Sequence, residues 1–170
     1  MQIDVVVDDI AFVAADAVAR PVNAELRAVT PVIRRMEAAA GDALVRQLRV
    51  NDPLEVGSAV ATGAGALPAE LIIHAVVSTL REAVSRDGVR RATVSALQRA
   101  HDFDVGHLAI APFGLGAGNL DVDDAAQTMI GAMNEHRSRS PRPARISIVV
   151  ENELEADAFR AAVARLWCGA

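Results

Sequence analysis

The chain has 170 residues, a mass of 17.9 kDa and a net charge of −5, from 22 acidic and 17 basic residues. This length suits one domain, and a hydrophobic share of 52% beside 23% charged residues excludes a disordered tail. Apart from histidine, every basic residue is an arginine, which excludes both a Schiff-base lysine and the lysine of a phosphate-binding P-loop.

The first half of the chain predicts a strand, a helical segment and a hairpin. Residues 3–7 are almost continuously apolar and β-branched, which predicts a strand that ends at two aspartates. Apolar residues recur at helical spacing over residues 22–49, and Gly41 is expected to divide that segment into two helices. Residues 55–61 and 71–77 predict two strands joined by a wide antiparallel hairpin loop.

The second half of the chain alternates between helix and strand. The expected elements, in order, are a helix over 88–101, a strand over 105–111, a helix over 121–137, a strand over 146–150 and a helix over 153–167. About five or six strands and five helices in this alternating pattern predict a layered α/β fold, with residues 1–170 as a single domain.

A glycine-rich turn precedes the helix expected at 121–137. The run Pro112–Asn119 contains Gly114, Gly116 and Gly118 between an expected strand and that helix. Such a turn exposes unpaired backbone N–H groups that suit a phosphate. The same pattern also serves as a tight turn that only needs positive φ angles, and the aspartates that open the helix oppose a bare diphosphate. Both interpretations stay open at this point.

Four motifs, in their order along the chain, resemble those of the macro domain family. Asp9-Ile10 follows the first strand, and Asp16-Ala17-Val18 stands where the family has a D-A-I motif. The run Val56–Val76 reads V-G-S-A-V-A-T-G-A-G-A-L-P and then L-I-I-H-A-V, similar to the middle of a macro domain. Pro112–Leu120 resembles the phosphate loop of the family with one residue deleted. The sequence is therefore similar to a divergent macro domain over nearly its whole length.

The resemblance implies a three-layer α/β/α sandwich with a mixed, mostly parallel sheet and a cleft that accepts ADP-ribose in relatives. It implies adenine recognition at Asp9, since a carboxylate past a strand end can accept a hydrogen bond from the adenine amine. The candidate ligand-binding residues are Asp9, Ile10, Arg20, Asn23, Val32, Gly114, Leu115, Gly116, Ala117 and Gly118. Neither a cofactor nor a metal site is expected.

Several positions depart from the family pattern. The run Arg20–Asn23 stands where catalytic relatives have N-A-A-N, and it keeps only Asn23, the candidate for a catalytic residue. The glycine loop of the family is Val29–Val32 here, with side chains and one proline that restrict backbone contact with a ligand. Ile33 and Glu37 occupy the positions of the aspartate and histidine of hydrolytic relatives, so no water-activating pair is expected.

Two further residues, Arg20 and His74, each have two interpretations. Arg20 could clamp a phosphate with two hydrogen bonds, although arginine is the only strong base of this chain and will also occur by chance. His74 lies inside the strand expected at 71–77, and we expect it to be a structural residue rather than a catalyst.

Three functions follow from these residues. We rank first a non-catalytic binding module for ADP-ribose or a related adenine diphosphate or phosphate ligand. The alternatives are a degenerate fold that acts as a scaffold or oligomerisation domain, possible as a homo-oligomer, and an ADP-ribosyl hydrolase.

Composition also sets expectations for location and partners. No apolar run reaches about 18 residues, and the amino terminus has acids where a signal peptide has bases, so a cytoplasmic bacterial protein without a membrane partner is expected. The single cysteine, Cys168, excludes a disulfide within the chain. The acidic net charge and few aromatic residues argue against nucleic-acid binding.

Overall fold

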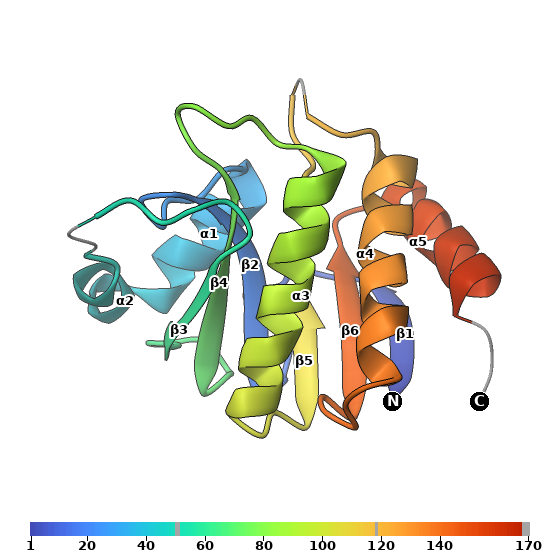
Figure 1. The fold of residues 1–170 in the computed structure, drawn as a ribbon. Helices are drawn as coiled ribbons and strands as arrows, with labels where there is room; N and C mark the ends of the chain where they lie inside the picture. Colours follow the sequence, from blue (N-terminus) through green and yellow to red (C-terminus); the bar gives the residue numbers. More distant parts are fainter. Residues whose placement is uncertain (50–51, 118, 168–170) are drawn as a thin grey trace.

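The computed structural model describes residues 1–49, 52–117 and 119–167 (Figure 1). The strands are β1 (Gln2–Val7), β2 (Ala17–Asn23), β3 (Ala59–Gly63), β4 (Leu71–Ser78), β5 (His107–Ile110) and β6 (Arg145–Val150). The helices are α1 (Pro31–Ala40), α2 (Asp42–Gln47), α3 (Arg86–Asp102), α4 (Val122–Arg137) and α5 (Glu153–Leu166).

The strands form one 6-stranded sheet in the order β1-β6-β5-β2-β4-β3. Every neighbouring pair is parallel except β3 and β4, which are antiparallel. The prediction of a mixed, mostly parallel sheet is therefore confirmed. Because β1, β6, β5, β2 and β4 run in the same direction, the loops after them meet at one edge, where open α/β sheets bind ligands.

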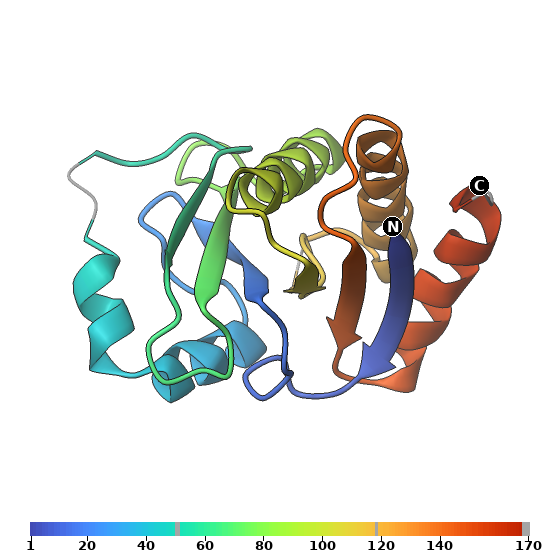
Figure 2. The ribbon, with the colours of Figure 1, turned by 90° about the horizontal axis from the view of Figure 1, so that it is seen from below.

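Helices cover both faces of the sheet, as Figure 2 shows along the strands. On one face, α3, α4 and α5 close the larger core, which includes Leu97, Met129 and Phe159. On the other face, Ile33 and Met36 of α1 pack in a second core with residues of the sheet. The α/β/α arrangement inferred from the sequence is thus confirmed.

The helix expected to begin at residue 22 begins at Pro31 instead. Residues 17–23 form β2, which is buried between β4 and β5. A central parallel strand is apolar on both faces, so its pattern does not distinguish it from the start of a buried helix. The true start is set by Thr30, whose Oγ1 accepts the N–H of Ile33 at 3.4 Å. Proline in the first helical turn loses no hydrogen bond.

The strand expected over 55–61 is also displaced, because β3 begins at Ala59. Gly57 has a φ of +93°, which ends an extended run, and a Cβ there would lie 2.7 Å from the Cβ of Arg91. The described helices include none that is both apolar enough and long enough to span a bilayer.

Candidate functional site

A groove of about 240 Å³ opens at the carboxyl edge of the sheet. Its lining comes from the start of α1, from the turn after β5 and from the end of β6 with the start of α5. The lining residues are Thr30, Pro31, Val32, Ile33, Ala111, Pro112, Leu115, Gly116, Val149, Glu151 and Glu155. The structure therefore brings three of the sequence-predicted ligand residues, Val32, Leu115 and Gly116, to one cavity.

The turn after β5 presents unpaired backbone donors. Hydrogen bonds from Leu120 N–H to the oxygen of Gly114 and from Asn119 N–H to the oxygen of Gly116, both 3.1 Å, close the turn. Gly114 and Gly116 have φ angles of +86° and +132°, in the region that favours glycine. Among the described residues, the N–H groups at positions 114–117 have no acceptor. Such a run of free amides forms an anion-binding concavity. Gly118 lies outside the described residues.

The start of α1 forms the facing part of the groove. Thr30 caps the helix through Ile33, and Pro31 has no N–H, so the N–H of Val32 has no acceptor among the described residues. The helix dipole adds partial positive charge at this end. The two sides approach closely, because a Cβ on Gly116 would lie 3.9 Å from Cγ2 of Thr30. The side chains that replace the family's glycines therefore narrow the groove without filling it.

Two glutamates give the groove an acidic side that the sequence analysis missed. Glu151 and Glu155 both line the cavity, and none of its described lining residues is basic. Glu151 pairs with Arg35 of α1 at 2.9 Å, an exposed ion pair. Glu155 accepts the N–H of Glu151 at 3.0 Å while Asn152 accepts the N–H of Glu155 at 3.0 Å. The N-x-x-E capping signal after a predicted strand could have located these residues.

Asp9 and Ile10 lie beside the groove rather than in its lining. The Oδ1 atom of Asp9 accepts the N–H of Ala11 at 3.0 Å, which fixes the turn after β1. Ile10 is buried in the core that also contains Val149, a lining residue of the groove. The turn itself is held to β6 by a 3.1 Å bond from Asp8 N–H to the oxygen of Val150. Asp9, expected to bind adenine, and the candidate ligand residue Ile10 therefore lie near the β6 end of the groove.

Arg20 is buried, which argues against the phosphate clamp that the sequence left open. Its side chain has no exposed surface. Nε donates to Nδ1 of His74 at 2.8 Å, and Nη2 donates to the oxygen of Leu26 at 3.1 Å. Nη1 lies 3.2 Å from Oε2 of Glu37 in an ionic contact rather than a hydrogen bond. Protein groups therefore surround the guanidinium, which favours a structural role for Arg20.

His74 continues this buried network toward β3. Because Nδ1 accepts from Arg20, Nε2 carries the ring proton and donates to Oγ1 of Thr62 at 2.8 Å. Burial, reinforced by the charge of Arg20, lowers the pKa of His74 from 6.5 to about 3. The geometry supports the structural role that the sequence suggested.

This low pKa predicts a pH effect on stability. The unfolded chain protonates His74 below pH 6.5 and the folded chain only near pH 3, so between these values the unfolded state binds more protons. Stability should therefore fall as the pH drops through this window. Side-chain ¹⁵N NMR of the folded protein should show a neutral His74 ring from pH 8 to pH 5. A midpoint near pH 6.5 would contradict the buried network.

Three residues stand at the positions of catalytic groups in hydrolytic relatives. Asn23 and Glu37 contact other groups of the protein, and Ile33 is apolar. Oδ1 of Asn23 accepts the N–H groups of Glu25 at 3.1 Å and of Arg27 at 3.0 Å, which shapes the turn after β2. Ile33 is buried, and Glu37 faces Arg20. None of these groups is arranged to activate water in the groove. In the described part of the chain, no group of three or more His, Cys, Asp and Glu side chains could hold a metal ion.

Fold and groove together define an α/β protein with a glycine turn of acceptor-free backbone amides, among the described residues, at the carboxyl edge of its sheet. A family model described as the macro domain matches residues 19–129. The chain therefore belongs to the macro domain family.

The chain is also similar to curated proteins from other organisms. An uncharacterized protein of Aquifex aeolicus is 35% identical over 136 residues, which are 76% of this chain and 79% of the relative. An uncharacterized protein of Mycobacterium tuberculosis is 33% identical over 155 residues, covering 91% of this chain but 43% of the relative. The chain thus spans less than half of that mycobacterial protein.

Two solved structures show the shared fold. The Oceanobacillus iheyensis macrodomain with ADP has a TM-score of 0.87 at 17% identity, over 97% of this chain and 91% of that one. The Trypanosoma brucei macrodomain in complex with ADP-ribose has a TM-score of 0.85 at 17% identity, over 95% of this chain and 69% of that one.

Proposed function

We propose that this domain is a non-catalytic binding module for ADP-ribose or a related adenine diphosphate. One observation carries the proposal: the N–H of Val32 and the N–H groups of the turn after β5 lack acceptors among the described residues, and both segments line one groove. Two phosphate groups are natural acceptors for donors on two sides of a groove. The macrodomain structures with ADP and ADP-ribose support the choice of ligand.

The volume of the groove limits how much of the ligand it can enclose. Its volume of about 240 Å³ is below the lower limit of roughly 300 Å³ for pockets that enclose a drug-sized ligand. We therefore expect it to hold the diphosphate and an adjoining ribose. The adenine would extend past Val149 toward Asp9 and Ile10, which border this end.

Thermal denaturation with ADP-ribose tests the proposal. A ligand at 100 times its dissociation constant stabilises the native state by about 2.7 kcal/mol, which should raise the melting temperature by several degrees. Adenosine, which lacks phosphate, should give a smaller shift. If ADP-ribose, ADP and inorganic phosphate all leave the melting temperature unchanged, the domain is not such a module.

Absence of hydrolysis needs a separate measurement. Incubation with a mono-ADP-ribosylated protein should release no ADP-ribose above the buffer control, because Asn23, Ile33 and Glu37 are not arranged to activate water. Release that Asn23→Ala abolishes would show that the domain is a hydrolase after all.

Glu151→Gln should strengthen ligand binding. Removing a carboxylate that lines the groove, and freeing Arg35 from it, should raise the affinity for ADP-ribose roughly three- to tenfold. Titration calorimetry at low salt measures this gain. Glu135→Gln is the matched control, because Glu135 is 49% exposed like Glu151 and pairs with Arg90 on another face. Equal affinities for the two variants would exclude an electrostatic role of Glu151.

A further inference from the structure

The outer edge of β1 is a free edge of the sheet. β1 ends the strand order, and β6 is the strand that pairs with it (Figure 2, β1 in dark blue). The N–H of Gln2 donates to the oxygen of Ala144 at 2.8 Å, and the N–H of Asp8 donates to the oxygen of Val150 at 3.1 Å. Successive residues of a strand point their backbone groups to opposite edges, so the even-numbered residues of β1 face β6.

The odd-numbered residues of β1 point their backbone groups away from the sheet. These residues are Ile3, Val5 and Val7. In the described part of the chain, no second strand pairs with β1, and no backbone group outside β6 bonds to these three residues. Their N–H and C=O groups are therefore free to bond to one more strand.

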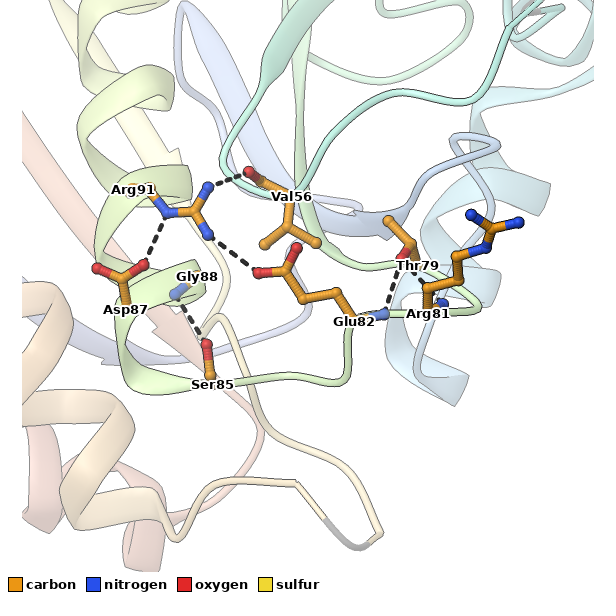
Figure 3. Close-up of polar contacts among 8 residues, drawn as sticks. All are labelled: Val56, Thr79, Arg81, Glu82, Ser85, Asp87, Gly88 and Arg91. Carbon is orange, nitrogen blue, oxygen red and sulfur yellow. Dashed lines mark hydrogen bonds and ion pairs between the residues drawn. The ribbon is translucent and has the colours of Figure 1, made fainter.

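Two other parts of the surface are closed by contacts within the chain. At the β3 edge of the sheet, the N–H of Gly63 donates to Oε1 of Gln47 in α2 at 3.0 Å. Beside the loop after β4, the guanidinium of Arg91 donates to the backbone oxygen of Val56 at 2.6 Å and to Glu82 at 3.0 Å, as Figure 3 shows. No described side chain covers the outer edge of β1 in this way.

β1 also lacks the features that commonly prevent an edge strand from pairing. It contains no lysine and no proline, and its register with β6 is continuous, without a bulge. Its one charged residue, Asp4, is neutralised by Arg145 at 2.6 Å and accepts a hydrogen bond from Ser147 at 2.7 Å. The strand is otherwise mostly β-branched, which favours pairing with another strand.

A hollow of about 490 Å³ lies beside the amino-terminal half of β1. Its lining residues are Met1, Gln2, Ile3, Asp4, Arg145, Val163 and Trp167. At the other end of the strand, Val7 is 41% exposed, and its side chain lies on the same face of the sheet as that of Ile3. An antiparallel second copy of β1 would place its own Val7 beside Ile3, at this hollow. Each edge thus carries an exposed apolar side chain and the hollow that receives it, as a two-fold interface requires.

The hydrogen-bonding groups define where the two-fold axis lies. With the axis at Val5, Ile3 faces Val7 of the second copy and Val5 faces its own equivalent, so all three outward-facing residues form hydrogen-bonded pairs. In this register Gln2 faces Asp8 of the second copy on the opposite face of the sheet. The amide of Gln2 makes no side-chain hydrogen bond in the described part of the chain, and it can donate to that carboxylate.

The two neighbouring registers are opposed by charge. An axis at Asp4 would set the two Asp4 carboxylates directly opposite each other. An axis at Val6 would set Asp4 opposite Asp8 of the second copy. Each also leaves one outward-facing residue without a partner, and like charges directly opposite destabilise a pair of strands. The edge is therefore self-complementary in one register.

We propose that two copies of this chain associate through antiparallel β1 strands, with Val5 on the two-fold axis, and form one continuous sheet. Pairing along one short strand buries less surface than a standard interface, so the dimer should dissociate on dilution. The association does not depend on the ligand proposed above, because no residue of β1 lines the groove.

Sedimentation equilibrium of the full chain, over about a hundredfold range of concentration, measures the association. The mass should rise from 17.9 kDa toward twice that value as the concentration increases. A mass of 17.9 kDa at every concentration would overturn the proposal.

Amide hydrogen exchange, followed by NMR, identifies the edge and the register. A higher protein concentration should slow exchange at Ile3, Val5 and Val7, but not at Asp4 or Val6, whose N–H groups already face β6. Slowing at only two of the three odd-numbered residues would contradict the axis at Val5. Slow exchange of all three at the lowest concentration would mean that another part of the chain covers the edge, and the proposal would be wrong.

Val5→Pro should raise the dissociation constant of the dimer more than about tenfold, because it removes the N–H groups that bond at the axis. The bonds to β6 remain, since the N–H of Val5 faces outward. Val7→Lys is a second variant that adds a charge to the edge, and it should weaken the dimer in the same direction. Val94→Lys is its matched control, because Val94 is 38% exposed and lies on α3. Equal effects of the two lysines, or a dimer that a folded Val5→Pro protein retains, would overturn the interface.

Disulfide formation gives an independent test of the register. In a Cys168→Ser background, Val5→Cys places two thiols at the axis, with Cα atoms about 5.5 Å apart, which is within the range of a disulfide. Val7→Cys places them roughly 14 Å apart along the strands, beyond the limit of about 7 Å. Mild oxidation should therefore cross-link Val5→Cys and leave Val7→Cys monomeric on a non-reducing gel. The reverse result would contradict the axis at Val5.

Binding of ADP-ribose separates this proposal from the proposed function. Val5→Pro should bind ADP-ribose with the affinity of the wild type, because Val5 does not line the groove. A protein that dimerises through β1 but binds no ADP-ribose would contradict only the proposed ligand. A protein that binds ADP-ribose but stays monomeric at every concentration would contradict only the dimer.

Discussion

Glu37→Gln is expected to lower the free energy of unfolding by about 3–5 kcal/mol, because Arg20 would keep a buried charge with no carboxylate beside it. Arg20 has no exposed surface, and Glu37 lies 3.2 Å away with 22% of its side chain exposed. Burial lowers the pKa of Arg20, and Glu37 opposes that effect. Urea denaturation at pH 7 measures the loss.

A surface ion pair provides the control for this prediction. Arg90 and Glu135 are paired at 2.7 Å with both side chains 49% exposed, so Glu135→Gln should cost at most about 1 kcal/mol. The double variant Arg20→Met/Glu37→Leu removes both buried charges and should recover part of the loss. It will not recover all of it, because His74 loses its donor. A cost of Glu37→Gln no larger than that of Glu135→Gln would contradict the buried pair.

The same variant distinguishes a structural Arg20 from a ligand-binding one. If Arg20 held the phosphate of a ligand, removing the competing carboxylate of Glu37 would increase the affinity for ADP-ribose. We expect no such increase in the fraction that stays folded, because Arg20 is enclosed by His74, Leu26 and Glu37.

Elements with a local signal could be predicted from the sequence. The helix Arg86–Asp102 has an N-cap serine and regular apolar spacing, and the range 88–101 predicted from that spacing agrees with it to within two residues at each end. The strand Ala17–Asn23 has no alternation of apolar and polar residues, and it contains Arg20 and Pro21. Its strand state depends on β4 and β5 at its sides, which pair with it from distant parts of the chain. No local pattern carries that information.

In the candidate site, too, some features could be predicted from the sequence and others could not. The glycine turn was predictable because a positive φ at Gly114 and Gly116 is a property of the residue type. The burial of Arg20 was not predictable, because its partner His74 is 54 residues away in the sequence. The local sequence around an arginine is the same whether the guanidinium is buried or binds a ligand. The acidic side of the groove was missed because Glu151 also fits a solvated strand end.

Leu115→Glu is expected to reduce the affinity for ADP-ribose about 100-fold. Leu115 lines the groove and lies in the turn whose N–H groups have no acceptor among the described residues. A carboxylate about 6 Å from one phosphate charge costs roughly 2.8 kcal/mol at an effective dielectric constant of about 20, which is about two orders of magnitude in affinity. Titration calorimetry at low salt gives the affinity, and rising salt should weaken the effect.

Two controls isolate the charge at this position. The glutamine of Leu115→Gln has nearly the same size as glutamate but no charge. If charge repulsion is the main cause, this variant should lose less than about tenfold in affinity for ADP-ribose. Val94→Glu introduces the same side chain on the exposed face of α3, away from the groove, and should leave the affinity unchanged. Because the change at Leu115 does not alter a glycine, the turn keeps its positive φ angles and the melting temperature without ligand should stay close to that of the wild type. A folded Leu115→Glu protein that binds ADP-ribose as well as Val94→Glu would mean that the diphosphate lies elsewhere, and the free amides of this turn would then have no part in recognition.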